Sequence, residues 1–174
     1  MVVSLSRYDP SISYKNQKSF DCGHKVINDF VARSLKQQSQ RNLSVAYVLT
    51  DEDDLLIGFC TLMSASIGKS ELAATQPPSL PMAVPVTKLS MLGVLLTHAG
   101  QGYGRQLLRH AIRVTVQNAA AIGSYGLYLD ADDGAYDFYI KHAFVPLKAR
   151  QTPDPTPMFL PIQTARQAIP SVTT

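Results

Sequence analysis

Apolar residues recur at two spacings along the chain, and these spacings predict alternating strands and helices. Short runs rich in Val, Leu, Ile, Tyr and Phe predict strands. These strands are expected in the first few residues and at 43–50, 55–66, 89–96, 125–130, 144–147 and 157–162. Apolar residues at helical spacing predict helices over 23–38, over about four turns after Gly102, and over 135–142.

Local residue choice predicts how several of these elements begin and end. Asp21 is a suitable N-cap for the helix at 23–38. The acidic turn 51–54 joins two strands into a hairpin, and Gly58 within it marks a bulge or a close backbone approach. Four prolines make 69–85 a loop that crosses the molecule or lies at an edge.

The long helix divides into two faces. Leu107, Leu108, Ala111, Ile112 and Val114 lie on the arc that is predicted to be buried. The opposite arc carries Arg105, Gln106, Arg109, His110, Arg113 and Gln117 and is expected to face water or a polyanion, with His110 solvated. Gly123 is a suitable C-terminal stop.

The stretch from Ala99 to Arg105 joins the apolar run at 89–96 to this helix and contains three glycines. Such a loop leaves its backbone N–H groups free to converge on an anion, and the helix adds the positive end of its dipole. No Lys-Ser or Lys-Thr follows, so the loop is not a P-loop. The glycine spacing and the position past mid-chain also exclude a Rossmann fingerprint. We therefore predict a phosphate or pyrophosphate cradle.

Composition and charge limit the number of domains, the cellular location and the classes of partner that the chain can have. A length of 174 residues predicts one domain over 1–162, followed by a frayed tail at 163–174. Two cysteines are too few for a disulfide scaffold or a metal site, and no stretch has the pattern of a signal peptide or membrane span. We therefore expect a cytoplasmic protein without a metal. A net charge of +3 is compatible with a nucleotide or RNA partner.

Two motifs in the second half resemble those of the GNAT N-acetyltransferases. Gly102 and Gly104 fill the small positions of the signature Gln/Arg-x-x-Gly-x-Gly/Ala, with Ala99 in place of Gln or Arg. The stretch from Ala135 to Phe144 resembles Ala-x-x-Phe-Tyr-x-x-x-Gly-Phe, with Ala143 for glycine. That exchange suggests a turn that is not strictly left-handed. The resemblance implies the α/β GNAT fold, a mixed, mostly antiparallel sheet of six to seven strands flanked by helices.

A third motif, from Phe20 to Phe30, resembles the opening of a GNAT subfamily that includes toxins of bacterial type II toxin–antitoxin pairs. Those toxins acetylate the amino acid on aminoacyl-tRNA and so block translation. The resemblance implies acetyl-CoA as cosubstrate, aminoacyl-tRNA as acceptor, a ribbon-helix-helix antitoxin and a homodimer.

The resemblance also assigns site residues. Tyr139 matches the tyrosine that protonates the departing thiolate, and a phenol is protonated at pH 7. Strand backbone at Leu92, Gly93 and Val94 would hold the pantetheine arm; Gly93 alternatively forms a bulge or is merely small. The pyrophosphate would lie on Ala99, Gly100, Gln101, Gly102, Tyr103, Gly104 and Arg105. A basic rim for tRNA would comprise Lys25, Arg33, Lys36, Arg41, Lys88, Arg109 and Arg113.

No carboxylate stands at the end of the central strand to act as a general base, and His98 is not expected to serve. A site without that base suits an α-amine, with a pKa of about 8, better than a lysine amine at about 10.4. Met91 stands where the toxins commonly carry Arg, which leaves two alternatives open. One is an acetyltransferase of a small amine or a protein N-terminus, and the other is a CoA-binding protein without turnover.

Overall fold

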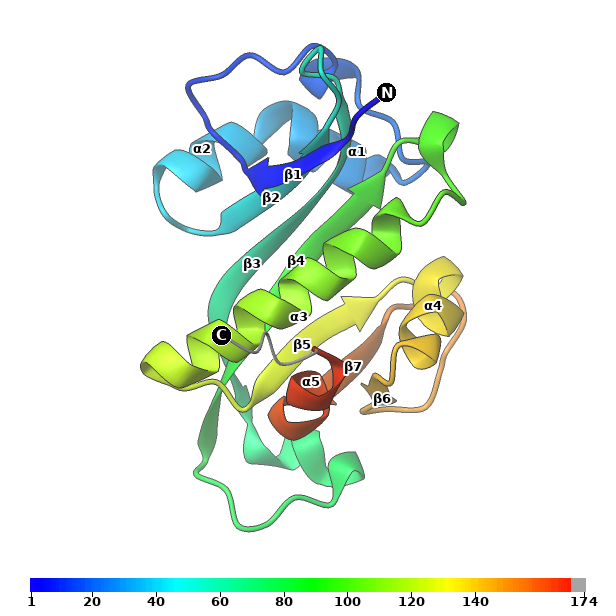
Figure 1. Ribbon diagram of the computed structural model, residues 1–174. Coiled ribbons are helices and arrows are strands. Elements are labelled where there is room, and N and C mark those ends of the chain that lie inside the picture. The colour runs from blue at the N-terminus through cyan, green and yellow to red at the C-terminus, as the bar shows by residue number, and fades with distance from the viewer. Residues whose placement is uncertain (170–174) are drawn as a thin grey trace. The chain divides into compact units, whose positions relative to one another are not determined.

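Seven strands form a mixed sheet in the computed structural model, which describes residues 1–169 (Figure 1). The strands are hydrogen-bonded in the order β1-β2-β3-β4-β5-β7-β6. Their bounds are β1 Ser4–Arg7, β2 Val45–Thr50, β3 Leu56–Gly68, β4 Ala83–Val94, β5 Gly126–Ala131, β6 Val145–Pro146 and β7 Thr156–Pro161. Strands β4 and β5 pair in parallel, whereas the β1–β2, β2–β3, β5–β7 and β6–β7 pairs are antiparallel. This is the mixed, mostly antiparallel sheet that the sequence predicted.

Helices and short 3₁₀ segments connect these strands. The α-helices are α1 Lys25–Arg33, α2 Leu35–Gln40, α3 Tyr103–Ile122, α4 Tyr136–Lys141 and α5 Ile162–Ala168. The 3₁₀ segments are η1 Gln17–Ser19, η2 Lys69–Thr75, η3 Leu96–His98 and η4 Asp133–Ala135. The polypeptide forms two compact units: Met1–Met63 with Leu89–Ala111, and Ser64–Lys88 with the chain from Ile112 onward.

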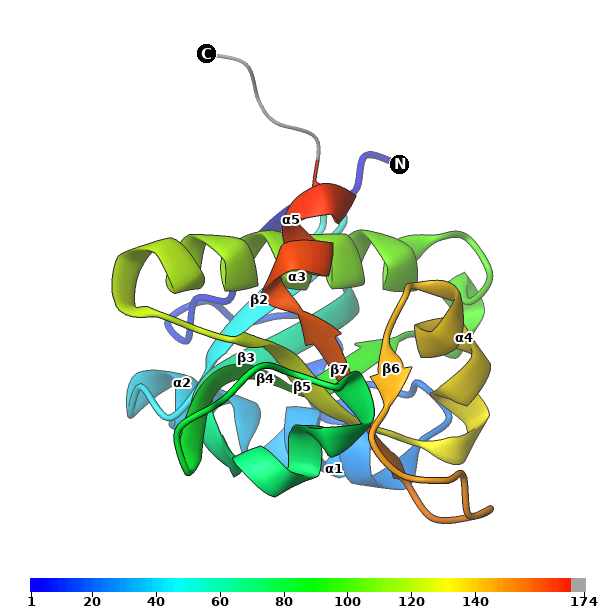
Figure 2. The same ribbon diagram turned by 90° about the horizontal axis from the view of Figure 1, so that it is seen from below.

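The first unit is layered. Helices α1 and α2 cover one face of its strands, and the first half of α3 covers the other (Figure 2). Neighbouring strand residues point to opposite faces. Accordingly, Phe59 packs edge-on against Phe20, with ring centroids 5.6 Å apart, while a Cβ on Gly58 would point at Leu107 of α3. The Val and Leu positions that predicted strands and helices here form this core.

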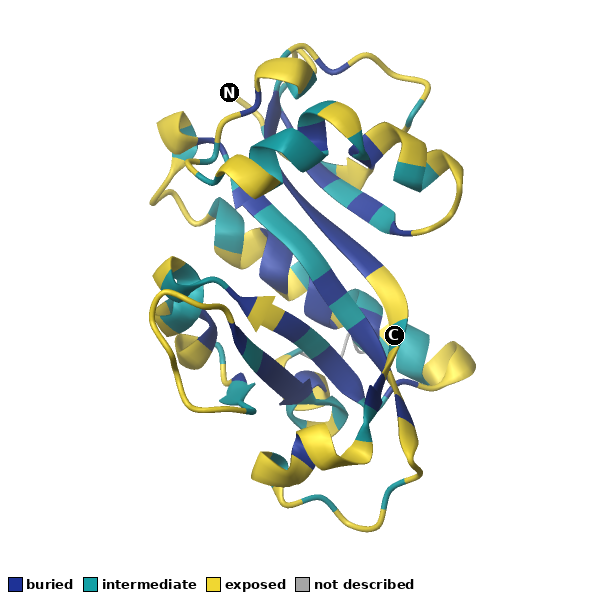
Figure 3. Ribbon diagram, turned by 180° about the vertical axis from the view of Figure 1, so that it is seen from behind, coloured by how far each residue is buried: buried dark blue, intermediate teal, exposed yellow. Residues whose placement is uncertain are grey.

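The second unit is built on the β5–β7 pair, which runs from Gly126 opposite Pro161 to Ala131 opposite Thr156. The first half of β4 lies parallel to β5, with Thr87 opposite Leu127. The buried positions of each unit follow its strands, while its helices are exposed on their outer sides (Figure 3). One apolar cluster of this unit comprises Ile67, Leu72, Val84, Val86 and Phe159.

Two predicted boundaries before the glycine loop are wrong. The predicted helix at 23–38 is two helices that meet at Ser34, which is the C-cap of α1 and the N-cap of α2 and has φ −114° and ψ −28°. Strand β4 begins at Ala83 rather than Leu89, because Val84 and Val86 are buried while the intervening Pro85 is exposed. Pro85 contributes only an acceptor there, taking a hydrogen bond from the Tyr125 N–H at 2.8 Å.

The chain from Gln163 was predicted to be frayed, which is wrong for its first part. Residues up to Ala168 form α5, and Ala165 on that helix is fully buried. Residues 170–174 of the predicted tail lie outside the described residues. Helix α3 is also longer than the predicted four turns, with 20 residues ending at Ile122.

Within residues 1–169, none of the helices is long and apolar enough to cross a membrane. The same part of the chain holds no group of three His, Cys, Asp or Glu side chains that could bind a metal ion. Cys22 and Cys60 do not form a disulfide.

Candidate functional site

The glycine loop has the geometry of an anion cradle. Gly100 and Gly102 adopt φ of +74° and +87°, a left-handed conformation that favours glycine. Nothing lies within 4 Å of a Cβ built at either position, so the loop is open. Helix α3 begins at Tyr103 without an acidic residue in its first turn, and its first N–H groups have no partner within the helix. The first N–H groups of α3 and the positive end of its dipole therefore lie at this open loop, and the binding of an anion there stays a prediction.

The 3₁₀ segment η3 leads into this cradle and places His98 beside it. His98 Nδ1 lies 2.9 Å from Thr97 Oγ1, and its ring centroid lies 6.2 Å from that of Tyr103. One ring nitrogen of His98 is thus engaged by its neighbour. That His98 does not act as a general base stays a prediction.

The Phe20–Phe30 motif is hydrogen-bonded to the start of η3. The Asn28 side chain accepts a hydrogen bond from the Cys22 N–H at 2.9 Å and donates to Asp21 Oδ1 at 2.8 Å. The Asp21 carbonyl accepts a hydrogen bond from the Leu96 N–H at 3.0 Å, just before the cradle. The predicted N-cap role of Asp21 is wrong, because His24 is the N-cap and the Asp21 carboxylate binds Gly23 and Asn28 instead. Sequence reasoning missed this function of Asn28.

Two glycines bring β3 and β4 close together in the first unit. A Cβ on Gly58 would lie 3.0 Å from the Gly93 carbonyl oxygen, and the β2–β3 register skips Ile57 beside it. Both expectations for Gly58, a bulge and a close approach, are therefore confirmed. A Cβ on Gly93 would lie 3.0 Å from Ile27 Cγ2, so Gly93 is small because α1 packs over it. Leu92 and Val94 on either side are partly exposed.

The predicted basic rim divides into paired and exposed cations. Lys25 forms an ion pair with Asp29, and Lys88 Nζ lies 3.3 Å from Asp130 and 5.6 Å from the centre of the Tyr128 ring. Lys25 is exposed despite its ion pair, and so are Arg33 on α1, Lys36 on α2, Arg41 after it, and Arg109 and Arg113 on α3. Arg105, Arg109 and Arg113 follow one another at intervals of four and form an exposed stripe along α3.

The expectation that His110 is solvated is wrong. His110 is partly buried, and its ring packs against Tyr47 with centroids 4.3 Å apart. Tyr47 belongs to β2, so this contact is absent from any pattern local to α3.

Tyr139 lies in the second unit on α4. Its side chain is buried, with a fractional exposure of 7%, and packs against Phe138 and Phe144 at centroid distances of 5.1 and 5.4 Å. The carbonyl of Tyr139 accepts a hydrogen bond from the Phe144 N–H at 3.2 Å. Aromatic packing and this turn therefore fix the position of the phenol. The predicted capping by Asp132 and Asp133 is wrong, because neither η4 nor α4 has a side-chain cap.

The turn after α4 is left-handed despite its alanine. Ala143 adopts φ +67°, and its N–H donates to the Ile140 carbonyl at 3.1 Å. The expectation that the turn is not strictly left-handed is therefore wrong. The chain keeps the conformation that a glycine would favour, because the Phe144 contact to Tyr139 requires it.

We expect Ala143→Gly to stabilise the protein by about 1 kcal/mol, because it removes the Cβ penalty of a left-handed residue. Thermal unfolding should show a Tm higher by about 2–4 °C. Ala120→Gly, at an exposed position within α3, is the control and should lower the Tm. A decrease for both variants would contradict the expectation.

The chain resembles known acetyltransferases and toxins. Residues 15–144 match the model of the acetyltransferase (GNAT) family. A tRNA-acetylating toxin of Mycobacterium tuberculosis is 32% identical over 127 residues, which cover 72% of this chain and 76% of that protein. A crystal structure of a bacterial toxin superposes with a TM-score of 0.94 at 34% identity, covering 99% of this chain and 98% of that one. AtaT complexed with acetyl-methionyl-tRNAfMet superposes with a TM-score of 0.82 at 24% identity, covering 95% and 98%.

Proposed function

Because this chain belongs to the acetyltransferase (GNAT) family, we propose that it transfers an acetyl group from acetyl-CoA to the α-amino group of aminoacyl-tRNA. The assignment of aminoacyl-tRNA as the acceptor rests on the 32% identity to a tRNA-acetylating toxin over most of both chains. The exposed arginine stripe on α3 and the net charge of +3 support a polyanionic substrate. Acetylation of charged tRNA would block translation, so the protein would act as a cytoplasmic toxin.

Different residues of the chain bind acetyl-CoA and polarise its thioester. Bound acetyl-CoA supplies the acetyl group as an activated thioester. Backbone N–H groups from Gly100 to Gly104 hold its pyrophosphate, with Arg105 as a charge partner. A backbone N–H on β4, at Leu92, Gly93 or Val94, donates to the thioester carbonyl oxygen and stabilises the charge that develops there.

Tyr139 completes the reaction as a general acid. The amine nitrogen bonds to the acetyl carbon and loses a proton to water, while the carbon–sulfur bond breaks. Tyr139 donates its phenolic proton to the departing sulfur and regains a proton from solvent. Because an α-amine has a pKa of about 8, a useful fraction is neutral at physiological pH without a carboxylate base.

A second candidate acceptor is a small amine or a protein N-terminus. Met91 favours this alternative, because it packs against the core cluster of the first unit where the toxins commonly carry an arginine. A CoA-binding protein without turnover is the third alternative.

A toxin function implies protein partners. We propose a ribbon-helix-helix antitoxin that neutralises the enzyme, and a homodimer as the active form. The structures similar in fold include AtaT bound to a segment of the antitoxin AtaR. Co-expression with the adjacent gene product, followed by sizing of the complex, tests both partners.

The experiment that tests the function measures transfer of labelled acetyl from acetyl-CoA to total charged tRNA. Deacylated tRNA and a panel of small amines serve as parallel acceptors. Label on aminoacyl-tRNA alone would support the proposal. Label on small amines alone would favour the second candidate, and bound acetyl-CoA without transfer would favour the third.

The arginine stripe predicts a salt-dependent interaction with tRNA. The double variant Arg109→Gln with Arg113→Gln should weaken tRNA binding and reduce the slope of log K against log salt by about 1–2, because two phosphate contacts are lost. Binding titrations at several salt concentrations measure the slope. Lys148→Gln with Arg166→Gln removes two other exposed charges and is the matched control. Equal effects of both pairs would mean that only net charge matters.

The cradle predicts that Gly102→Ala weakens acetyl-CoA binding about 10-fold, because the alanine disfavours the left-handed backbone by about 1–2 kcal/mol. Titration calorimetry measures the Kd. Gly123→Ala is the matched control, since Gly123 has φ +85° and equally open surroundings but ends α3 rather than opening it. The control should lose stability and keep its affinity. A similar Kd for both variants would contradict the assignment of the cradle.

A further inference from the structure

The helix that carries Tyr139 is too short to hold its own position. Helix α4 has six residues, from Tyr136 to Lys141, and has no side-chain N-cap. Helices of this length are marginal in water unless other parts of the protein pack on them. The side after Tyr139 is held by the Ala143 turn and by His142 Nδ1, which lies 2.7 Å from the Phe138 carbonyl oxygen.

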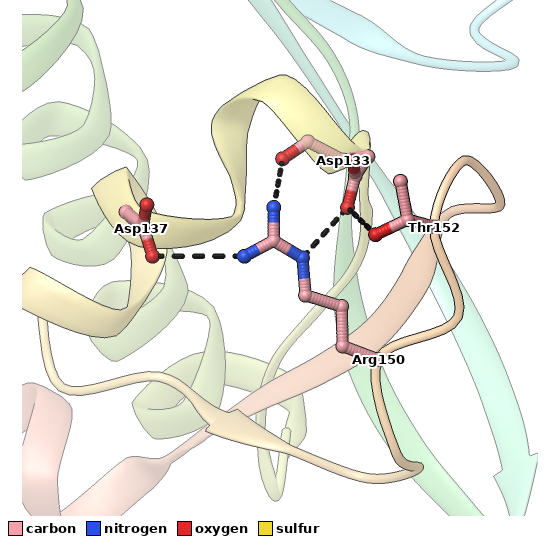
Figure 4. Close-up of polar contacts among 4 residues, drawn as sticks. All are labelled: Asp133, Asp137, Arg150 and Thr152. Atoms are coloured by element: carbon pink, nitrogen blue, oxygen red, sulfur yellow. Dashed lines mark hydrogen bonds and ion pairs between the residues drawn. The ribbon is translucent and has the colours of Figure 1, made fainter.

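The side before Tyr139 is held by one arginine from a distant loop. Arg150 Nε lies 2.7 Å from Asp133 Oδ1, and Arg150 Nη2 donates to the Asp133 carbonyl at 3.1 Å (Figure 4). A third guanidinium nitrogen, Nη1, lies 3.8 Å from Asp137 Oδ1. Thr152 Oγ1 adds a hydrogen bond to Asp133 Oδ1 at 3.2 Å. We call these residues, with Tyr136, the Arg150 cluster.

The planar guanidinium also stacks on α4 itself. Its carbon Cζ lies 4.4 Å from the centre of the Tyr136 ring, within the range of a cation–π contact. Tyr136 and Asp137 precede Tyr139 by three and two residues, so Arg150 contacts the helical turn that carries the phenol. The hydrogen bond from Arg150 holds the pKa of the Asp133 carboxyl below its ordinary value, so the Asp133–Arg150 pair is charged at neutral pH.

We propose that Arg150 is a positioning residue that fixes α4, and with it Tyr139, for proton donation. The loop that carries Arg150 thereby acts on the reaction through Asp133, Tyr136 and Asp137 rather than by touching substrate. This inference rests on the proposed function, because that function gives Tyr139 its role. The contacts of the Arg150 cluster are independent of the proposed function.

The first test is a double-mutant cycle on kcat with Arg150→Ala and Tyr139→Phe. Arg150→Ala should lower kcat about 10-fold in the wild-type background, since small displacements of a reacting group are costly, with KM for acetyl-CoA unchanged. In the Tyr139→Phe background it should have no further effect, because the group that it positions is gone. Equal losses in both backgrounds, or no loss in either, would overturn the proposal.

Two further variants separate geometry from charge. Arg150→Lys keeps the charge but loses the fork that reaches Asp133, Asp137 and the Tyr136 ring together, so it should behave like Arg150→Ala. Lys148→Ala removes a neighbouring exposed charge from the same loop and should leave kcat unchanged. Full rescue by Arg150→Lys would overturn a positioning role that depends on the guanidinium.

A second readout does not depend on the acceptor. Hydrogen exchange of peptides covering residues 133–144 should be faster in Arg150→Ala than in wild type, while exchange in α3 stays unchanged. If wild type fails to acetylate charged tRNA, the proposed function fails and this exchange measurement alone decides whether Arg150 holds α4. Unchanged exchange over 133–144 would overturn the proposal whatever the acceptor is.

Discussion

Tyr139→Phe is expected to lower kcat for acetyl transfer about 100-fold, because general acid catalysis typically contributes at least that factor. The phenylalanine keeps the ring that packs against Phe138 and Phe144 and removes the hydroxyl. KM for acetyl-CoA and the Tm should therefore stay near the wild-type values. Steady-state kinetics with labelled acetyl-CoA and charged tRNA measure the effect.

Tyr125→Phe is the matched control for this prediction. Tyr125 is another tyrosine of the second unit; it is partly buried and stacks on Phe159 with centroids 5.9 Å apart. Removing the Tyr125 hydroxyl in this variant should leave kcat unchanged. If Tyr139→Phe transfers acetyl as fast as wild type, the general acid is another group and the Arg150 proposal loses its target.

Gly126→Ala is expected to destabilise the protein by about 3 kcal/mol, because overpacking a tight site forces the backbone to move. A Cβ at this position would overlap the Leu160 carbonyl oxygen and would lie 2.5 Å from Phe159 Cζ. Gly126 is paired with Pro161 at the start of the β5–β7 ladder, so a shift there separates the two strands. The Tm should fall by about 6–12 °C, measured by circular dichroism or calorimetry.

Gly134→Ala provides the comparison for Gly126→Ala. Nothing lies within 4 Å of a Cβ at Gly134, and its backbone is not left-handed. This variant should unfold within about 2 °C of wild type, as most exposed substitutions do. Similar Tm values for the two variants would show that β5 and β7 can separate at little cost.

The glycine loop and the buried face of α3 could be predicted from sequence because their causes are local. Gly100 and Gly102 adopt the left-handed conformation that glycine favours, and the Leu107, Leu108 and Ala111 arc is fully buried. Gly123 ends the helix with φ +85° as its residue type suggests. In each case a residue's own conformational preference, or its spacing from neighbours within two turns, fixes the outcome.

Two of the mistaken predictions concern residues whose partners are distant in sequence. His110 is partly buried because it meets Tyr47, which is 63 positions away by residue number. Asp133 was expected to cap a helix, but Arg150 on a later loop binds its carboxylate. Ala143 is a different case, because a local turn that returns Phe144 to Tyr139 imposes the left-handed conformation on a residue that disfavours it.

The sequence by itself determined the order of the strands, the glycine loop before α3 and the family motifs that include Tyr139. Periodicity, glycine conformation and helix ends act over a few residues and can be recognised along the chain. Only the tertiary structure decided why Gly58, Gly93 and Gly126 must be small, and which loop holds α4. Those features arise where strands, helices and loops far apart in sequence come within contact distance. A local sequence pattern does not reveal such contacts.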